Sequence, residues 1–151
     1  MKLRISGDKF TIASAHMLTR HDKCARLHGH NYLVEIEVEG ELNEKNMVVD
    51  FGEIKSKIAP ILKDLDHRIL IPLESPHFVI ETNEKETKVK TSEGKFYRFP
   101  SEDVVLLPLK STTVEILSKY VHNLIKEIYP NLKITVIMSE TPTSVAIYSE
   151  N

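Results

Sequence analysis

Residues 28–40 read His-Gly-His-Asn-Tyr-Leu-Val-Glu-Ile-Glu-Val-Glu-Gly, and this stretch decides the fold. In its second half every other residue is apolar, which is the period of a β-strand with one buried face; these residues are Tyr32, Val34, Ile36 and Val38. The preceding segment, Phe10 to His16, is a second predicted strand. Since the end of one strand in an antiparallel hairpin lies beside the start of the next, we expect His16 to lie near His28 and His30.

Two helices are predicted farther along the chain. The first begins after Asp50, which can serve as N-cap with Glu53 three residues on, and Pro60 should kink or divide it. The second begins after Thr112, which can also serve as N-cap, and ends before Pro130. Both carry apolar residues at helical spacing, namely Phe51, Ile54, Ile58, Ile61 and Leu65 in the first and Val114, Leu117, Val121, Leu124 and Ile128 in the second.

Further strands are predicted after each helix. Residues 74–108 contain three short candidates, at 78–82, 87–91 and 95–99, with a turn at Ser92-Glu93-Gly94. After the second helix, apolar residues alternate again, first at Ile134, Val136 and Met138 and then at Val145 and Ile147. This order of elements indicates an α+β fold with antiparallel pairing. Its open sheet edges lead us to expect completion by other subunits.

The composition is that of one globular domain, residues 1–151, with 41% hydrophobic and 28% charged residues. Lys and Arg total 20 against 22 Asp and Glu, and the net charge of −2 argues against a nucleic-acid binder. No apolar run approaches the roughly 20 residues that cross a bilayer, so no membrane partner is expected. A single cysteine excludes an internal disulfide and, without a signal peptide, predicts a cytoplasmic protein.

Histidines are concentrated between residues 16 and 30. On a strand His28 and His30 point to the same face, and with His16 as third ligand they can hold a metal; three imidazoles suit zinc. An isolated His-x-His pair, however, is often only two surface histidines. Cys24 leaves three interpretations open: a fourth ligand that closes a structural zinc site, a small buried side chain, or a reactive thiol beside an open catalytic site.

Other candidate residues have a structural interpretation beside the functional one. His67 ends the first predicted helix, where it can satisfy the helix C-terminus, and a contact with the adjacent Asp66 would need a non-helical bend. Glu140 continues the apolar face of its strand, although a glutamate at a strand end is often solvated. Glu115 can form a capping box with Thr112.

Together these segments resemble the 6-pyruvoyl-tetrahydropterin synthase and 6-carboxytetrahydropterin synthase family. The matches come in family order and cover nearly the whole chain except residues 74–108. They are Phe10–His16, Cys24–Tyr32, Val49–Phe51 with Ile54-Lys55, Leu65–His67, Thr113–Glu115 and Glu140-Thr141.

The resemblance implies the tunnelling fold: a four-stranded antiparallel sheet with two helices on one face, here with a strand-rich insertion at about 74–108. It implies a homo-oligomer, a trimer or a hexamer, with active sites between subunits. It also implies Zn²⁺ as cofactor, held by His16, His28 and His30.

The resemblance further assigns roles to the remaining residues. Cys24 corresponds to the catalytic thiol, and Asp66 with His67 to a second proton-transfer pair. Glu140 matches the acid that anchors the pterin ring. Thr113 and Glu115 match positions that line the same pocket.

The spacing of Cys24 and His28, four positions apart, looks like that of the 6-carboxytetrahydropterin synthases of the queuosine and archaeosine pathway. The implied reaction is a zinc-dependent lyase reaction that converts 7,8-dihydroneopterin triphosphate to 6-carboxy-5,6,7,8-tetrahydropterin, with release of acetaldehyde and triphosphate. One alternative is a related lyase that forms 6-pyruvoyl-tetrahydropterin or a 6-hydroxymethyl pterin. Another is a non-enzymatic zinc- or pterin-binding protein.

Overall fold

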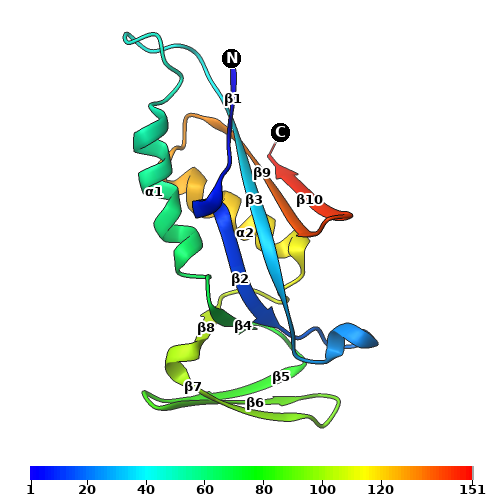
Figure 1. Cartoon of the computed structure of the whole chain (residues 1–151). Coiled ribbons are helices and arrows are strands. Elements are labelled where there is room, and N and C mark those ends of the chain that lie inside the picture. The colour runs from blue at the N-terminus through cyan, green and yellow to red at the C-terminus, as the bar shows by residue number, and fades with distance from the viewer. Residues whose placement is uncertain (151) are drawn as a thin grey trace.

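The computed structural model describes residues 1–150, and its central element is a seven-stranded sheet built around β3 (His28–Glu39). On one side β3 pairs antiparallel with β9 (Lys133–Thr141), and β9 pairs antiparallel with β10 (Ser144–Ser149) at the sheet edge (Figure 1). These strands lie where the alternating apolar residues predicted them.

The other side of β3 pairs with two shorter strands that follow one another. β1 (Lys2–Ile5) pairs antiparallel with the second half of β3, and β2 (Thr11–His16) with the first half. A 3-10 turn, η1 (Asp8–Phe10), separates them after Gly7, whose φ of 132° favours glycine. The strands β2, β3, β9 and β10 are the antiparallel sheet expected from the sequence.

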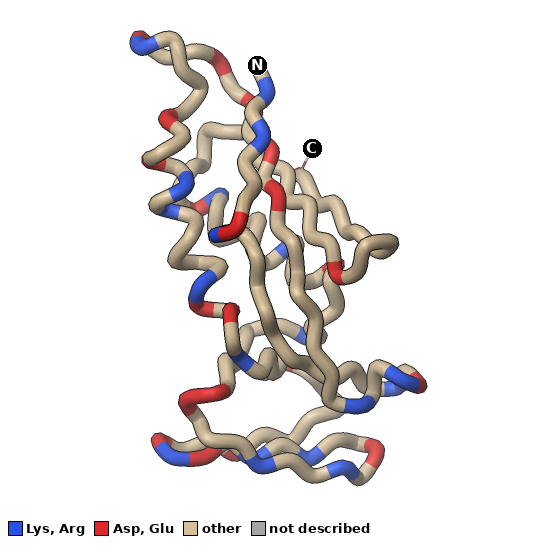
Figure 2. The backbone as a smooth tube through the Cα atoms, in the orientation of Figure 1, with Lys and Arg blue, Asp and Glu red and all other residues tan. Residues whose placement is uncertain are grey.

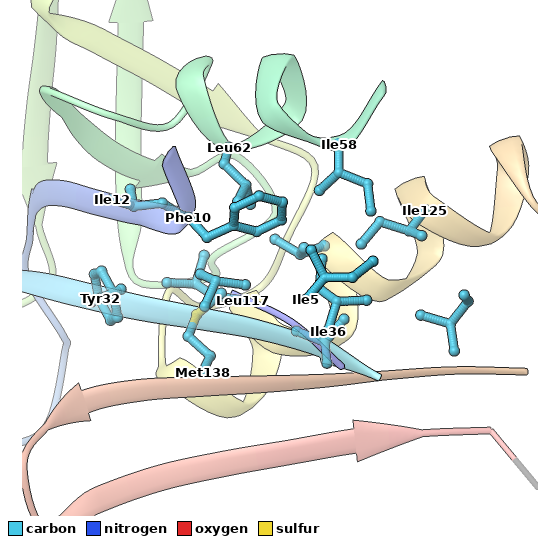
Figure 3. Packing of buried hydrophobic residues seen from close by; sticks show 14 of the residues in the cluster. Ile5, Phe10, Ile12, Tyr32, Ile36, Ile58, Leu62, Leu117, Ile125 and Met138 are labelled. Carbon is cyan, nitrogen blue, oxygen red and sulfur yellow. The ribbon is translucent and has the colours of Figure 1, made fainter. Parts of the chain in front are cut away.

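One face of this sheet is covered by α1 (Phe51–Lys63) and α2 (Val114–Ile128) (Figures 1 and 3). The Asp50 carboxylate caps α1 as predicted, accepting a hydrogen bond from the Glu53 N–H at 2.8 Å. The helix runs on through Pro60 to its end and is not divided there. Pro60 lacks the N–H that would bond the Ser56 carbonyl, so α1 loses one hydrogen bond there while the helix continues to Lys63. No helix within residues 1–150 is both long and apolar enough to span a membrane.

The second helix begins differently from the prediction. Its N-cap is Thr113, and that side chain makes no capping hydrogen bond, so the predicted capping box of Thr112 with Glu115 is wrong. Thr112 is instead fully buried. Its carbonyl oxygen bonds to the imidazole of His16, 96 residues away in sequence. This tertiary contact fixes the backbone of Thr112, and its Oγ1 has no hydrogen-bond partner among the described residues.

The main core lies between the sheet and the two helices (Figure 3). The alternating residues of β3 are at most 2% exposed, and they are Tyr32, Val34, Ile36 and Val38. Each such burial stabilises the fold by roughly 1.5–3 kcal/mol for an aliphatic side chain. On the opposite face, Leu33 and the β10 residues Val145 and Ile147 are exposed.

The chain after α1 extends the sheet by two strands that the sequence analysis missed. β4 (Arg68–Pro72) pairs parallel with β2, and β8 (Val104–Leu107) pairs parallel with β4. Both are short, nearly continuous apolar runs, as is usual for parallel strands covered on both faces. Such runs lack the alternation by which the other strands were found.

Between β4 and β8 lies a separate three-stranded antiparallel sheet, within a residue of the predicted positions. It consists of β5 (Phe78–Thr82), β6 (Glu86–Thr91) and β7 (Phe96–Pro100). A second, smaller core joins this sheet to the rest of the chain, and its buried members are Met17, Ile71, Val89 and Val104.

Asp50 before α1 and Thr112 near the start of α2 give different expectations for the stability of the protein. Asp50→Ala should lower the free energy of unfolding by about 1 kcal/mol, because it removes a side-chain cap. Thr112→Val should leave it unchanged or raise it, because the hydroxyl it replaces is buried and has no hydrogen-bond partner in the described part of the chain. Urea denaturation followed by circular dichroism measures both. A loss in Thr112→Val as large as that in Asp50→Ala would contradict this account of the α2 N-terminus.

Candidate metal centre and active site

Three histidines converge at the end of the β2–β3 pair. The antiparallel register places His16 directly opposite His28, and His30 lies two residues on, on the same face of β3. One nitrogen from each ring lies within 4.8 Å of the others, and the Nε2 atoms of His16 and His28 are 3.1 Å apart. The convergence expected from the spacing of these residues is confirmed. Gly29 allows the close pairing, since a Cβ there would lie 3.1 Å from the Ser14 carbonyl oxygen.

Backbone carbonyls fix the orientation of two of the rings. The Nδ1–H of His16 donates to the carbonyl oxygen of Thr112 at 2.9 Å, and that of His28 donates to the carbonyl oxygen of Arg26 at 2.7 Å. With the proton on Nδ1, each Nε2 presents its lone pair to the centre of the group. This arrangement of an outer acceptor on the far nitrogen is usual for metal-binding histidines.

The donor set and its spacing fit a divalent metal. Two lone pairs 3.1 Å apart repel one another unless a cation lies between them. Two nitrogens that share a tetrahedral zinc at about 2.0–2.1 Å are separated by about 3.3 Å, close to the observed distance. Three neutral imidazoles leave one coordination position for another ligand, which is the pattern of catalytic zinc sites.

Burial keeps His16 neutral at physiological pH. His16 is fully buried, and desolvation lowers its pKa from 6.5 to about 4; its neighbours His28 and His30 lower the pKa further, while the bond to Thr112 opposes the shift. Tyr32 lies beside the group, with its ring centroid 5.5 Å from that of His30. Burial, together with the charge of Glu140, raises the pKa of Tyr32, which therefore stays protonated.

Glu140 lies at the rim of the histidine group. It follows the buried residues of β9 on the same face, as the sequence indicated, and its side chain is 23% exposed. One carboxylate oxygen, Oε1, is 3.5 Å from His30 Nε2 and 3.9 Å from His16 Nε2. An anionic acceptor therefore stands next to the candidate metal position and open to a ligand that enters there.

Cys24 lies outside the group of ligating atoms. It belongs to η2 (Lys23–Ala25) in the connection between β2 and β3, where it is half-buried and has a free thiol. Among residues 1–150, the group of ligating atoms that all lie within 4.8 Å of one another consists of the three histidines and does not include the Cys24 thiol. The geometry therefore does not support the interpretation of Cys24 as a fourth ligand.

Asp66 and His67 form the non-helical bend that their contact requires. His67 has a left-handed φ of 56°, and its Nδ1 lies 2.8 Å from Asp66 Oδ2. The second carboxylate oxygen, Oδ1, accepts a hydrogen bond from the Ala13 N–H at 2.7 Å. Desolvation alone would raise the pKa of Asp66, but the bond from Ala13 and the contact with His67 outweigh it and lower the pKa.

This pair does not join the three histidines within the chain. Ala13 and Ala15 alternate with Ser14 and His16 along β2, so they face the other side of the sheet. His67 is 83% exposed and lines a cavity of about 450 Å³ whose wall also includes Ala13, Asn31 and His30.

Thr113 and Glu115 lie at the start of α2, beside the Thr112 carbonyl that holds His16. The Glu115 side chain is exposed. Sequence analysis did not find Tyr32 or the carbonyls of Thr112 and Arg26. The only available signal was the position of Tyr32 two residues after His30 on the same face, because a backbone carbonyl leaves no mark in a sequence.

The fold and the site define an α+β protein with a candidate metal centre at one end of its sheet. The profile of the 6-pyruvoyl tetrahydropterin synthase family matches residues 5–151, and the chain belongs to this family. It is accordingly a lyase-type enzyme of pterin biosynthesis.

Relatives and solved structures agree with this assignment. A Haemophilus influenzae protein named 6-carboxy-5,6,7,8-tetrahydropterin synthase is 30% identical over 147 residues, which are 94% of this chain and 96% of the relative. A Methanocaldococcus jannaschii protein, provisionally given the same name, is 38% identical over 121 residues, 80% and 74% of the two chains. A catalytic-residue mutant of 6-pyruvoyltetrahydropterin synthase from Plasmodium vivax superposes with a TM-score of 0.91 at 27% identity, over 100% of this chain and 98% of the other. The expected tunnelling fold is thereby confirmed.

Replacing any one of His16, His28 and His30 by Ala should weaken metal binding by more than the roughly 10- to 100-fold that loss of an outer partner costs, because a ligand itself is removed. The measurement is zinc content per chain by elemental analysis after dialysis. His21→Ala, at an exposed histidine of the same connection, is the control and should keep its metal. Full zinc content in His30→Ala would exclude the three-histidine site.

The metal-free protein should lose stability as the pH falls from about 6.5 to about 4. Unfolded histidine binds a proton near pH 6.5, whereas folded His16 does so near pH 4, so the unfolded state binds more protons in this window. The contribution of His16 to the free energy of unfolding is fully present above pH 6.5. About 3 kcal/mol of this free energy is lost by pH 4. Urea denaturation with chelator, across this range, should show the stabilities of wild type and His16→Asn converging as the pH falls. Parallel pH curves for the two proteins would refute the assignment.

Proposed function

We propose that the protein is a zinc-dependent 6-carboxytetrahydropterin synthase. It converts 7,8-dihydroneopterin triphosphate and water to 6-carboxy-5,6,7,8-tetrahydropterin, acetaldehyde and triphosphate. The observation that carries the proposal is the convergence of His16, His28 and His30 beside Glu140 in a chain of this family. The compact spacing of Cys24 and His28, together with the name of the Haemophilus influenzae relative, favours the carboxy product.

The three histidines would hold zinc through Nε2 of His16 and His28 and a ring nitrogen of His30. When bound, zinc would supply a Lewis acid for the hydroxyl oxygens of the pterin side chain. The protein's own contribution is to keep His16 neutral through its burial, and to orient His16 and His28 through the carbonyls of Thr112 and Arg26.

Glu140 would orient the substrate. A carboxylate accepts two parallel hydrogen bonds, and a pterin ring presents adjacent N–H donors. Since Glu140 Oε1 lies 3.5 Å from His30 Nε2, a ring bound there would carry its side chain toward the histidine group. Tyr32, protonated and buried, would form a wall of the same site, while Thr113 and Glu115 would line it from the start of α2.

Proton transfer would come from two places. The reaction removes protons from the hydroxyl-bearing carbons of the side chain, and we assign Cys24 as the base on one side. His67, held by Asp66, would exchange protons on the other. Because His67 is exposed on the opposite face of β2 from the histidine group, it would serve the site of a neighbouring subunit in a trimer or hexamer.

We place this assembly in the cytoplasm, where a single free thiol stays reduced.

A second candidate is the 6-pyruvoyl-tetrahydropterin reaction on the same substrate. The observation that favours it is the name of the Plasmodium vivax protein that superposes on the whole chain. The two reactions differ in whether the side chain is cleaved, so the mass of the pterin product separates them.

Incubating the zinc-loaded protein with 7,8-dihydroneopterin triphosphate should yield 6-carboxytetrahydropterin, identified by mass spectrometry. Cys24→Ala should lower kcat by roughly 10²- to 10⁴-fold, which is what general base catalysis contributes, with unchanged zinc content. His21→Ala in the same connection is the matched control. A 6-pyruvoyl or 6-hydroxymethyl product would establish the alternative lyase. Loss of zinc in Cys24→Ala would instead make the thiol a structural ligand.

A further inference from the structure

The Cys24 loop, residues 17–27 between β2 and β3, contacts the β6–β7 hairpin, residues 86–100 (Figure 1). The first contact is apolar. Met17, at the start of the loop, is 1% exposed and belongs to the small core that contains Val89 of β6 and Val104 of β8. The loop is therefore anchored to the inserted sheet before it reaches the thiol.

The second contact is a charge-assisted hydrogen bond directly beside the thiol. Lys95, just after the hairpin turn, donates from Nζ to the carbonyl oxygen of Ala25 at 2.5 Å. Ala25 is the residue after Cys24, and the two partners are 70 residues apart in sequence. Lys88 and Arg98 pair with Glu86 within the hairpin, whereas Lys95 lies 3.8 Å from Glu93 of the turn and also reaches out of the hairpin to the Cys24 loop.

The third contact holds the loop on the other side of the thiol. Glu93 accepts a hydrogen bond from the backbone N–H of Arg20 at 2.7 Å. Arg20 has a left-handed φ of 58°, a conformation that a residue with a side chain rarely adopts without support. Figure 2 shows the charged residues of the loop lying beside those of the hairpin turn.

The turn that carries these two side chains is itself well ordered by hydrogen bonds. Gly94 N–H donates to the Thr91 carbonyl at 3.0 Å, and Lys95 N–H donates to Thr91 Oγ1 at 3.2 Å. Thr91 N–H in return donates to the Lys95 carbonyl at 2.9 Å, and Thr91 is buried. Glu93 and Lys95 therefore contact the loop from a turn whose backbone is held by hydrogen bonds.

We propose that the β6–β7 hairpin is a clamp that positions the Cys24 thiol, with Lys95 and Glu93 as its positioning residues. The role of the thiol in the reaction rests on the proposed function; the clamp itself rests on the contacts at Ala25 and Arg20. Displacing a reacting group by about 1 Å can cost a factor of 10² in rate, so a loop of this length gains from being held on both sides of the thiol.

The test is the rate at which iodoacetamide alkylates Cys24, the only cysteine, followed by intact mass. A hydrogen bond from a charged group stabilises the closed loop, so its loss in Lys95→Met should raise the open population of the loop about tenfold. The alkylation rate should rise by the same factor. Lys95→Arg keeps a donor and should return to within about twofold of wild type. Lys90→Met, at an exposed lysine of the same hairpin, is the matched control and should be unchanged.

Steady-state kinetics separates positioning from a general loss of structure. In Lys95→Met we expect kcat to fall about tenfold or more while KM stays within about twofold, because the Lys95 ammonium is engaged with the Ala25 carbonyl and a positioning residue acts on the reacting group. Far-UV circular dichroism confirms the fold of each variant. If Lys95→Met does not fold, Glu93→Ala decides the matter through amide hydrogen exchange at Arg20, which the clamp requires to be faster than in wild type.

Alkylation rates of Lys95→Met and Glu93→Ala within about twofold of wild type would overturn the clamp, as would unchanged exchange at Arg20. Failure of the proposed function has a different signature. Wild type would then form no 6-carboxytetrahydropterin, while the alkylation rates would still separate Lys95→Met from Lys90→Met.

Discussion

The pairing of β2 with β3 is the constraint on which the structure depends. Its register places His16 opposite His28 at one end and Ile12 opposite Tyr32 farther along, so the same pairing builds the candidate metal site and the core. A slip of one residue in this register would move His16 to the other face of the sheet, and Ile12 with it, so that both the candidate metal site and the core would be disrupted. The apolar alternation of β3, buried under α1 and α2, holds this register in place. Gly29 lets the strands approach at the point where the two imidazoles meet.

The site in turn changes the local structure around it. Thr112 is a residue type that often caps helices, yet its carbonyl orients His16, and its buried hydroxyl has no hydrogen-bond partner within residues 1–150. Natural proteins often break a local rule at a functional site and compensate elsewhere. Here the compensation comes from the apolar stripe of α2, whose Leu117, Val121 and Ile125 are almost fully buried. As a result, the His16 imidazole is buried and neutral, and its bond to the Thr112 carbonyl fixes its tautomer.

The strand β2 also separates two chemical groups. Its inner face carries His16, while its backbone at Ala13 holds the Asp66 carboxylate that orients His67 toward the other side. Within residues 1–150, Asp66 and His67 are therefore not part of the group of ligating atoms that converge at the candidate metal site. In the proposed assembly a neighbouring subunit would supply His67 to the histidine group, and the edge strand β10 offers unpaired backbone groups for contact with another chain. The sheet of β5, β6 and β7 also bears on the site, because it contacts the loop that carries Cys24.

Local pattern in the sequence was enough to find β3, β9, β10, both helices and the three strands of the insertion, because alternation and helical spacing are properties of neighbouring residues. It also found the three histidines, since two lie two residues apart on one strand and the third ends the strand before it. It could not find β4 and β8, whose apolar runs have no period, nor the true start of α2. The orientation of His16 by Thr112 and the contact of Glu93 with Arg20 join residues 96 and 73 positions apart. Only the tertiary structure decides such contacts, because they depend on how the packed elements lie and not on the order of the side chains within any one of them.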